Sequence, residues 1–149
     1  MNQVFVSIGS NIEAVSNMIL VKNYLDELFD VTYSSTYKTP AKGFEGEDFL
    51  NCVCKFDTKK SPLDLRDLLK TIEKDMGRTL NQKGMSNRVI DLDLILYGNM
   101  QINEDGLEIP SDDIAKYKFV LEPLVEIAPD NLHPTLKKSF QDLLSSFSD

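Results

Sequence analysis

Residues 88–98, RVIDLDLILYG, have the composition of a buried strand but carry Asp91 and Asp93 among the Val, Ile and Leu residues. Carboxylates rarely lie in apolar surroundings unless something compensates their charge. Side chains alternate along a strand, so residues i and i+2 share a face. We therefore expect both aspartates to point the same way, with Val89 and Ile95 continuing that face and the intervening leucines in the core.

Two like charges this close repel each other unless a cation lies between them. Mg²⁺ suits such a pair, because it prefers oxygen ligands and commonly uses one or two carboxylates together with substrate phosphates. The alternative is that the aspartates are simply the solvated face of a half-buried strand. A basic segment before the strand, with five cations against two carboxylates, favours an anionic ligand such as a nucleotide. Its cations are Lys70, Lys74, Arg78, Lys83 and Arg88, and its carboxylates are Glu73 and Asp75.

The composition indicates one globular domain spanning residues 1–149. The chain is 42% hydrophobic and 27% charged, which is ordinary for a folded protein. Its net charge of −8 argues against non-specific nucleic-acid binding. The sequence contains neither an apolar run long enough for a membrane span nor a signal-peptide pattern, so we expect no membrane association and a cytoplasmic location.

The few cysteines and the single histidine favour structural roles. Cys52 and Cys54 share one face of an expected strand, too far apart for an easy disulfide, and are expected to be small core residues in a reducing compartment. His133 precedes Pro134 in a loop and cannot form a zinc site by itself. We expect it to be structural or solvated.

The order of expected elements is β-α-β-β-α-β. Strands are expected at residues 3–11, 30–39, 49–58 and 88–98, and helices at 12–29 and 61–77. Beyond residue 98 the pattern predicts a short hairpin, a turn at Pro110 and a last helix near residues 136–147. This order predicts an α+β, ferredoxin-like sandwich, with the helices on one face of an antiparallel sheet and a C-terminal extension. The first helix carries apolar residues at helical spacing: Val15, Met18, Ile19, Val21, Leu25 and Leu28.

The segment GRTLNQKGMSNRVIDLDLILYG, residues 77–98, resembles the signature of the 6-hydroxymethyl-7,8-dihydropterin pyrophosphokinases of folate biosynthesis. In that family a Gly-Arg pair, a basic loop and an Arg-x-x-Asp-x-Asp strand occur at this spacing. Four further segments resemble the family in the same order along the chain: VSIGSN, SSTYKTPAKGFEGEDFLN, LLKTIEKDMGR and FVLEPLVEIAP.

The resemblance implies transfer of the pyrophosphoryl group of ATP to the hydroxymethyl group of the pterin, with release of AMP. It implies that Asp91 and Asp93 hold two Mg²⁺ ions, with ATP as the co-substrate. Arg78 and Arg88 match the phosphate-handling and catalytic arginines of the family, and Lys83 adds a cation near the phosphates. Glu73 matches a helix residue near the nucleotide; the alternative is a solvated helix carboxylate.

The resemblance also implies a pterin pocket. A flat heteroaromatic ring would stack between Phe49 and Phe119. Asn51 offers a donor and an acceptor to the edge of the pterin. Thr39 and Pro40 match the same pocket. Without the resemblance, both phenylalanines would be predicted as core residues.

The chain departs from the family pattern at several positions. Met85 and Asn87 stand where the family usually has Trp and Pro, and Leu80 stands where a second loop arginine is common. Ser111 and Asp112 follow Pro110, where histidine is frequent. These departures affect groups that close over ATP in the family, so we expect weaker attraction of the ATP phosphates, whereas the metal ligands are present.

Three alternatives stay open from the sequence. One is another two-aspartate phosphoryl or nucleotidyl transferase on a ferredoxin-like core, which would not need the pterin residues. A second is a non-catalytic small-molecule-binding domain, which would bind its ligand without Mg²⁺. The third is a catalytically silent relative. For the pyrophosphokinase we expect a monomer whose partners are small-molecule substrates, ATP and hydroxymethyl-dihydropterin, with no nucleic acid or membrane.

Overall fold

The computed structural model describes residues 1–40, 46–77 and 89–147. Within these ranges the chain forms one sheet of five strands and a separate two-stranded hairpin. The strands of the sheet are β1 (Asn2–Ser10), β2 (Thr32–Tyr33), β3 (Tyr37–Thr39), β4 (Phe49–Thr58) and β5 (Asp91–Tyr97). The hairpin consists of β6 (Ile102–Glu104) and β7 (Leu107–Ile109). The helices are α1 (Ala14–Leu28), α2 (Pro62–Asp75), α3 (Asp113–Lys116), α4 (Lys118–Ile127) and α5 (Phe140–Ser145).

The sheet is built around β1. Its strand order is β2-β4-β1-β5, with β3 also paired to β4, and all of these pairings are antiparallel. The pairing of β1 with β5 shifts between Phe5 and Val6, which face Leu96 and Leu94, so Ile95 is an extra residue in β5. Such a bulge locally increases strand twist. The predicted β-α-β-β-α-β order is confirmed, and with it the α+β, ferredoxin-like class.

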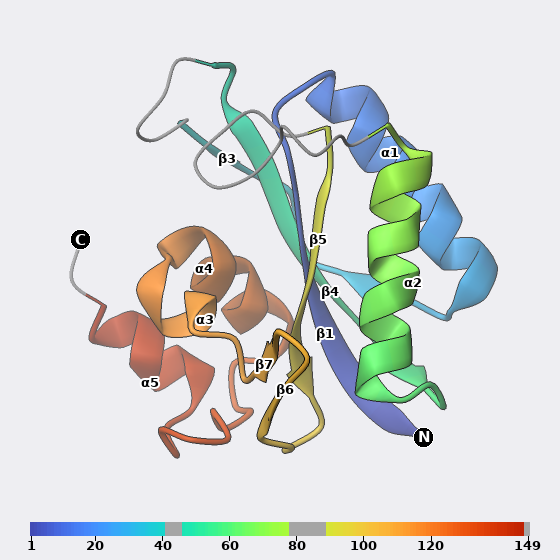
Figure 1. Cartoon of the computed structure of the whole chain (residues 1–149). Helices are drawn as coiled ribbons and strands as arrows, with labels where there is room; N and C mark the ends of the chain where they lie inside the picture. The colour runs from blue at the N-terminus through green and yellow to red at the C-terminus, as the bar shows by residue number, and fades with distance from the viewer. Residues whose placement is uncertain (41–45, 78–88, 148–149) are drawn as a thin grey trace.

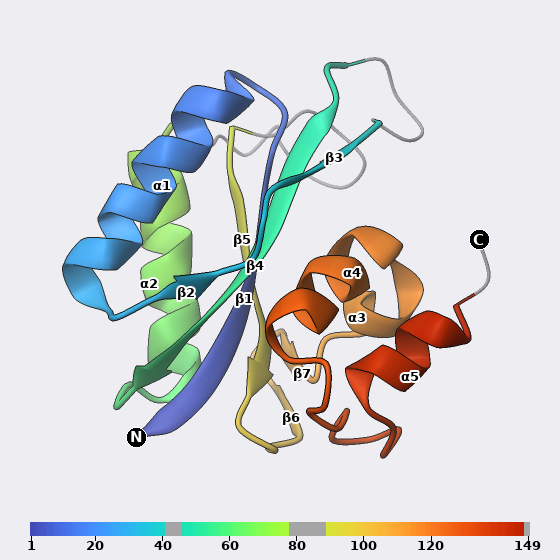
Figure 2. The same ribbon diagram turned by 180° about the vertical axis from the view of Figure 1, so that it is seen from behind.

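Helices α1 and α2 cover one face of the sheet (Figures 1 and 2). Helix α2 begins where the sequence predicts: the Ser61 hydroxyl accepts a hydrogen bond from the Asp64 N–H at 3.2 Å, and Pro62 occupies the first turn. Its residues Leu65 and Leu69 are buried. They pack in a core whose sheet residues are Val4, Val6, Ile8, Cys52, Cys54, Phe56, Leu92, Leu94 and Tyr97.

The helix predicted at residues 12–29 is confirmed as α1, but only part of its apolar set is buried. Met18, Val21 and Leu25 are buried, at the i, i+3, i+7 spacing of one helix face. Val15 and Ile19, however, are 66% and 59% exposed. The sheet contacts a narrower strip of α1 than the full set of apolar residues would occupy. Leu28, at the end of the helix, is 51% exposed as well.

The C-terminal segment covers the opposite face of the sheet. Helices α3, α4 and α5 lie on the side away from α1 and α2 (Figures 1 and 2). Phe5, Val53 and Ile95 of the sheet pack there with Leu121 and Leu124 of α4. The expectation of helices on one face only is therefore corrected. The physical reason is that β1, β4 and β5 carry apolar residues on both faces, so a second layer is needed to bury them.

Two predicted element boundaries are also corrected. The strand expected at residues 30–39 is divided into β2 and β3, because Ser34 interrupts the ladder. Its hydroxyl accepts a hydrogen bond from the Val53 N–H at 2.9 Å, in place of a backbone carbonyl. The last helix begins at Phe140 and not near residue 136, because Ser139 caps it, accepting a hydrogen bond from the Asp142 N–H at 3.0 Å.

The cysteines and the histidine have structural roles, as the sequence indicates. Cys52 and Cys54 are free and fully buried, and burial raises the pKa of Cys52 to about 11. His133 is buried, and its Nδ1 accepts hydrogen bonds from the backbone N–H groups of Thr135 and Leu136. Among the helices that the structure describes, each is too short or too polar to cross a membrane.

Candidate active site

Three neighbouring strands bring predicted site residues together at one end of the sheet. Gly9, near the end of β1, is the register partner of both Asn51 in β4 and Asp91 in β5. Adjacent strands lie about 4.8 Å apart, so the backbones at Asn51 and Asp91 are roughly 10 Å apart. Register partners direct their side chains to the same face of the sheet. Residues predicted for the pterin and for the metal therefore share one face and one end of the sheet.

The two aspartates lie on the face that α3, α4 and α5 cover farther along. Asp93 is in register with Ser7, and Ser7 with Val53, which is buried beneath the C-terminal helices. Both aspartates are partly exposed, whereas Ile95 on the same face is fully buried. The expected shared face of Asp91, Asp93 and Ile95 is confirmed. The aspartates therefore lie at the border between the part of this face that α3, α4 and α5 cover and the part that is open to solvent.

The carboxylates of this pair interact directly. Partial burial, followed by the charge of Asp91, raises the pKa of Asp93 to about 7, and a hydrogen bond between the two side chains contributes. A further carboxylate, Asp113 at the start of α3, has its pKa raised by burial and then by the charge of Asp91. Asp113 could not be predicted as part of this site, because only the fold brings it near Asp91.

A divalent cation fits this pair chemically. Two carboxylates that repel each other strongly enough to favour a proton on one of them would be relieved by a metal ion between them. Their oxygen atoms are the ligands that Mg²⁺ prefers. In the described ranges, no group of three or more His, Cys, Asp or Glu side chains is arranged to hold a metal. Among the described residues, Asp91 and Asp93 are therefore the candidate metal ligands, and two carboxylates suit an ion that is also bound by substrate phosphates.

Glu73 and Lys70 of α2 reach β5 beside the aspartates. Glu73 is 4% exposed, and its Oε2 accepts a hydrogen bond from the Leu92 N–H at 2.6 Å. The alternative of a solvated carboxylate at Glu73 is therefore wrong. The Lys70 ammonium donates to the Leu92 carbonyl at 3.1 Å and forms an ion pair with Asp93 at 3.4 Å. In the sequence Lys70 was only one cation of a basic segment, and its contact with Asp93 was not predicted.

The predicted pterin residues of β3 and β4 form one cluster. Asn51 is 5% exposed, and its Nδ2 donates a hydrogen bond to the Thr39 hydroxyl at 2.8 Å. Phe49 is in register with Thr39 and is half-buried. Gly9 belongs to this cluster, although the sequence did not indicate it. A Cβ atom at Gly9 would lie 3.0 Å from Asn51 Oδ1, so a larger residue here would push the Asn51 amide away.

Phe119 lies near the start of α4, and Pro40 is exposed at the end of β3. The ring of Phe119 stacks on Tyr117, with ring centroids 5.0 Å apart. Its pairing with Phe49 around a pterin stays a prediction. Helix α4 is tied to the β3 side by Glu126, which accepts hydrogen bonds from the Tyr37 hydroxyl at 2.7 Å and the Ser35 N–H at 2.9 Å.

Several predicted residues lie outside the described ranges. These are Arg78, Lys83 and Arg88, together with the altered loop positions Leu80, Met85 and Asn87. The predictions made for them stay predictions.

Comparison with protein families identifies the chain. The family model described as 7,8-dihydro-6-hydroxymethylpterin-pyrophosphokinase (HPPK) matches residues 5–129. The chain belongs to this family. The match includes both aspartates and all of the predicted pterin residues, and it confirms the resemblance seen in the sequence motifs.

Curated relatives of the HPPK chain include proteins of similar length. The chain is 35% identical over 150 residues to the 2-amino-4-hydroxy-6-hydroxymethyldihydropteridine pyrophosphokinase of Haemophilus influenzae, covering 97% of this chain and 92% of that one. It is 33% identical to the protein of the same name from Aquifex aeolicus, over 95% of this chain and 90% of that one. It is also 38% identical to the folic acid synthesis protein FOL1 of Dictyostelium discoideum, but spans only 21% of that protein.

Solved structures with this fold include HPPK-DHPS of Plasmodium falciparum. The superposition has a TM-score of 0.72 and covers 97% of the present chain at 14% identity. The chain spans 43% of the Plasmodium chain. This similarity supports the fold of the HPPK domain described above.

Proposed function

We propose that this protein transfers the pyrophosphoryl group of ATP to the hydroxymethyl oxygen of 6-hydroxymethyl-7,8-dihydropterin and releases AMP. The observation that carries the proposal is the register of Asn51, Gly9 and Asp91 across three adjacent strands, in a chain that belongs to the HPPK family. A site for a flat polar ring and a site for a phosphate-bound cation then lie within one small region. Transfer between two substrates requires that proximity.

Asp91 and Asp93 are proposed to hold Mg²⁺, as two ions bound together with ATP. Bound there, Mg²⁺ would neutralise phosphate charge and hold the entering and leaving oxygens in place. The chain contributes fixed carboxylates on a strand that is hydrogen-bonded to β1 on one side and to α2 on the other. Carboxylates held in place in this way would need little reorganisation during the reaction.

Arg78, Lys83 and Arg88 are proposed to bind the phosphates, with Arg78 and Arg88 placing fixed positive charge near the transferred group. This rests on their match to the family motif. Glu73 is proposed to act near the nucleotide through β5, because its carboxylate binds the Leu92 N–H between the two aspartates.

The pterin is proposed to bind against β3 and β4. The Asn51 side chain is held in place by Thr39, and its amide would recognise the polar edge of the pterin. Phe49 and Phe119 would stack on the two sides of the ring, with Pro40 at the rim. In this scheme the pterin hydroxymethyl group points from Asn51 toward Asp91.

We propose that residues 1–149 act as a single pyrophosphokinase domain, as a monomer in the cytoplasm. The altered positions Leu80, Met85 and Ser111 are expected to lower ATP affinity relative to family members that carry the usual groups. A protein that bound the pterin but released no AMP would be the catalytically silent alternative.

The test is an AMP-release assay with ATP, Mg²⁺ and 6-hydroxymethyl-7,8-dihydropterin. We expect AMP and the pterin diphosphate in equal amounts, and no AMP when the pterin or Mg²⁺ is omitted. Release of inorganic phosphate in place of AMP would favour another phosphoryl transferase. Pterin binding that is indifferent to Mg²⁺ and nucleotide, without turnover, would favour a non-catalytic binding domain.

A further inference from the structure

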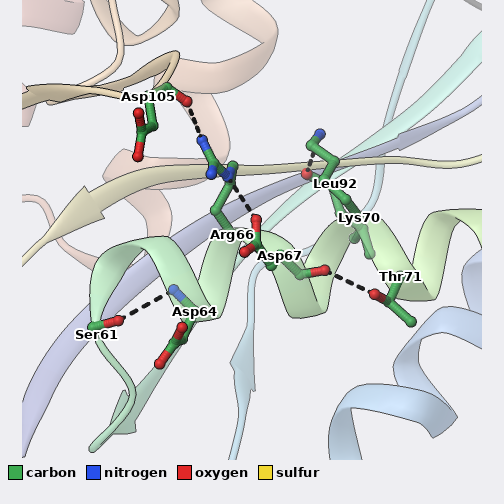
Figure 3. Close-up of polar contacts among 8 residues, drawn as sticks. All are labelled: Ser61, Asp64, Arg66, Asp67, Lys70, Thr71, Leu92 and Asp105. Atoms are coloured by element: carbon green, nitrogen blue, oxygen red, sulfur yellow. Dashed lines mark hydrogen bonds and ion pairs between the residues drawn. The ribbon is translucent and has the colours of Figure 1, made fainter.

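The edge of β5 between the two aspartates is held by α2. The Leu92 N–H donates to Glu73 Oε2 at 2.6 Å, and the Leu92 carbonyl accepts from Lys70 Nζ at 3.1 Å. Figure 3 shows Lys70 extending from α2 to Leu92. At the end strand of an antiparallel sheet, alternate residues direct both backbone groups outward. Lys70 and Glu73 together satisfy both of these groups on the residue between Asp91 and Asp93.

The Lys70 ammonium is fixed in place by several contacts. Its Nζ lies 3.2 Å from Glu73 Oε2 and 3.4 Å from Asp93 Oδ1, in addition to the contact with the Leu92 carbonyl. One turn earlier on the same side of α2, Arg66 donates to the backbone carbonyl of Asp105 in the hairpin that follows β5 (Figure 3). Helix α2 is thus joined at two points along this side to β5 and to the hairpin that follows it. Lys70, whose ammonium group lies beside Asp93, is one of these two contacts.

The ion pair between Lys70 and Asp93 places a positive charge beside a proposed metal ligand. Lys70 forms ion pairs with both Asp93 and Glu73, and Asp91 is a third carboxylate of the same cluster. An ammonium group 3.4 Å from Asp93 Oδ1 attracts the same oxygen atoms that would bind a metal. It also repels an approaching divalent cation.

We propose that Lys70 is a positioning residue that acts as the counter-cation of Asp93 in the metal-free protein, and that it weakens the binding of free divalent metal ions. Metal would then bind strongly only together with the nucleotide, whose phosphates supply additional negative ligands. This inference rests on the proposed function, because it concerns the same two aspartates. It adds a reason for the metal to enter with the nucleotide and not before it.

The test is a calorimetric titration of the nucleotide-free protein with Mn²⁺, used in place of Mg²⁺, at low ionic strength. Lys70→Gln removes the charge but keeps a hydrogen-bond donor for the Leu92 carbonyl. It therefore distinguishes the effect of the positive charge from the effect of the hydrogen bond that joins α2 to β5. We expect Lys70→Gln to bind Mn²⁺ about three- to tenfold more tightly than the wild type, a gain that shrinks with added salt. Lys70→Met should show the same direction of change.

Lys74→Gln is the matched control, because Lys74 is an exposed lysine on the same helix and makes no ion pair with a described residue. It should change Mn²⁺ affinity by less than about twofold. Adding Asp93→Asn to Lys70→Gln should abolish the gain. In the presence of a non-hydrolysable ATP analogue, the difference between wild type and Lys70→Gln should be smaller.

Unchanged Mn²⁺ affinity in Lys70→Gln would overturn the inference, as would an equal gain in Lys74→Gln, which would indicate a general charge effect. A variant that only loosened α2 would lower the melting temperature without tightening Mn²⁺, and this outcome would also overturn it. The titration uses the metal alone, so it does not depend on turnover. A wild-type protein that released no AMP would refute the proposed function and leave this measurement interpretable.

Discussion

Asn51 and Asp91 flank Gly9, one on each neighbouring strand, and all three are in register. β1 has no side chain at Gly9, and the Asn51 amide lies close to the backbone there. A Cβ atom at Gly9 would lie 3.0 Å from Asn51 Oδ1. The glycine therefore sets how closely Asn51 lies to the sheet.

Gly9→Ala is expected to weaken pterin binding. The added methyl group would displace the Asn51 amide and with it the hydrogen bond to Thr39. Overpacking of this kind costs about 1–3 kcal/mol, so we expect the pterin KM to rise by about tenfold. The KM for ATP should change little, because the displaced group lies on the pterin side. Steady-state kinetics with each substrate varied in turn would measure both.

The double variant Gly9→Ala/Asn51→Ala provides the control. If Gly9 acts through Asn51, the double variant should resemble Asn51→Ala alone, since two changes at one contact are not additive. Additive losses would mean that Gly9 affects the site by another route.

Asp91→Asn and Asp93→Asn are each expected to reduce AMP release by at least about a hundredfold, because each change removes a proposed metal ligand. The fold should survive, and relief of the repulsion between the two carboxylates should leave the metal-free variants as stable as the wild type or more so. Turnover and thermal melting would be measured on the same preparations. Near-normal turnover in both variants would rule out a metal site at these residues.

Much of this arrangement could be predicted from the sequence. The alternation in residues 88–98 was enough to place Asp91 and Asp93 on one face and the intervening leucines in the core, because strand geometry fixes that relation locally. The capping signal at Ser61 correctly marked the start of α2. Burial of the second face of the sheet was missed, because no helix was predicted over residues 118–127 and nothing local indicated which surface that segment would cover.

Contacts between distant segments could not be predicted. Lys70 and Asp93 are 23 positions apart, and their ion pair depends on how α2 packs against β5. Asp113 comes near Asp91 only through the path of the chain after β7. In α1, hydrophobic periodicity predicted the helix but not which apolar residues would face the sheet, since Val15 and Ile19 satisfy the same spacing and are exposed.

Glu126→Gln is expected to raise the pterin KM by about two- to fivefold while leaving kcat and the KM for ATP nearly unchanged. Glu126 joins α4, which carries Phe119, to Ser35 and to Tyr37, the first residue of the β3 strand that ends at Thr39. The hydrogen bond from Tyr37 lowers the pKa of Glu126, so the carboxylate is the form that makes these contacts. Loss of the Glu126 charge should weaken the contact between α4 and β3, so that Phe119 is held less firmly relative to Thr39 in the proposed pterin pocket.

Glu122→Gln is a suitable control for Glu126→Gln, because it makes the same charge change on α4 at a residue without a hydrogen bond from a described side chain. It should leave the pterin KM unchanged. Equal effects of the two variants would show that the general charge of α4, and not the contact with Tyr37, affects pterin binding.

The stability of the metal-free protein is expected to depend on pH through Asp93. The pKa of Asp93 is about 7 in the folded protein against an ordinary value of 3.8, because burial and the charge of Asp91 favour the protonated form. Between these two values the folded state binds more protons than the unfolded state, so the contribution of Asp93 to stability falls as the pH rises. Without metal, the melting temperature of the wild type relative to Asp93→Asn should therefore decrease from pH 5 to pH 8. Saturating Mg²⁺ with an ATP analogue should reverse the trend, because metal displaces the proton and binds better at high pH. A difference between wild type and Asp93→Asn that stayed constant across this range would show that Asp93 is ionised throughout, and that Asp91 does not control its charge.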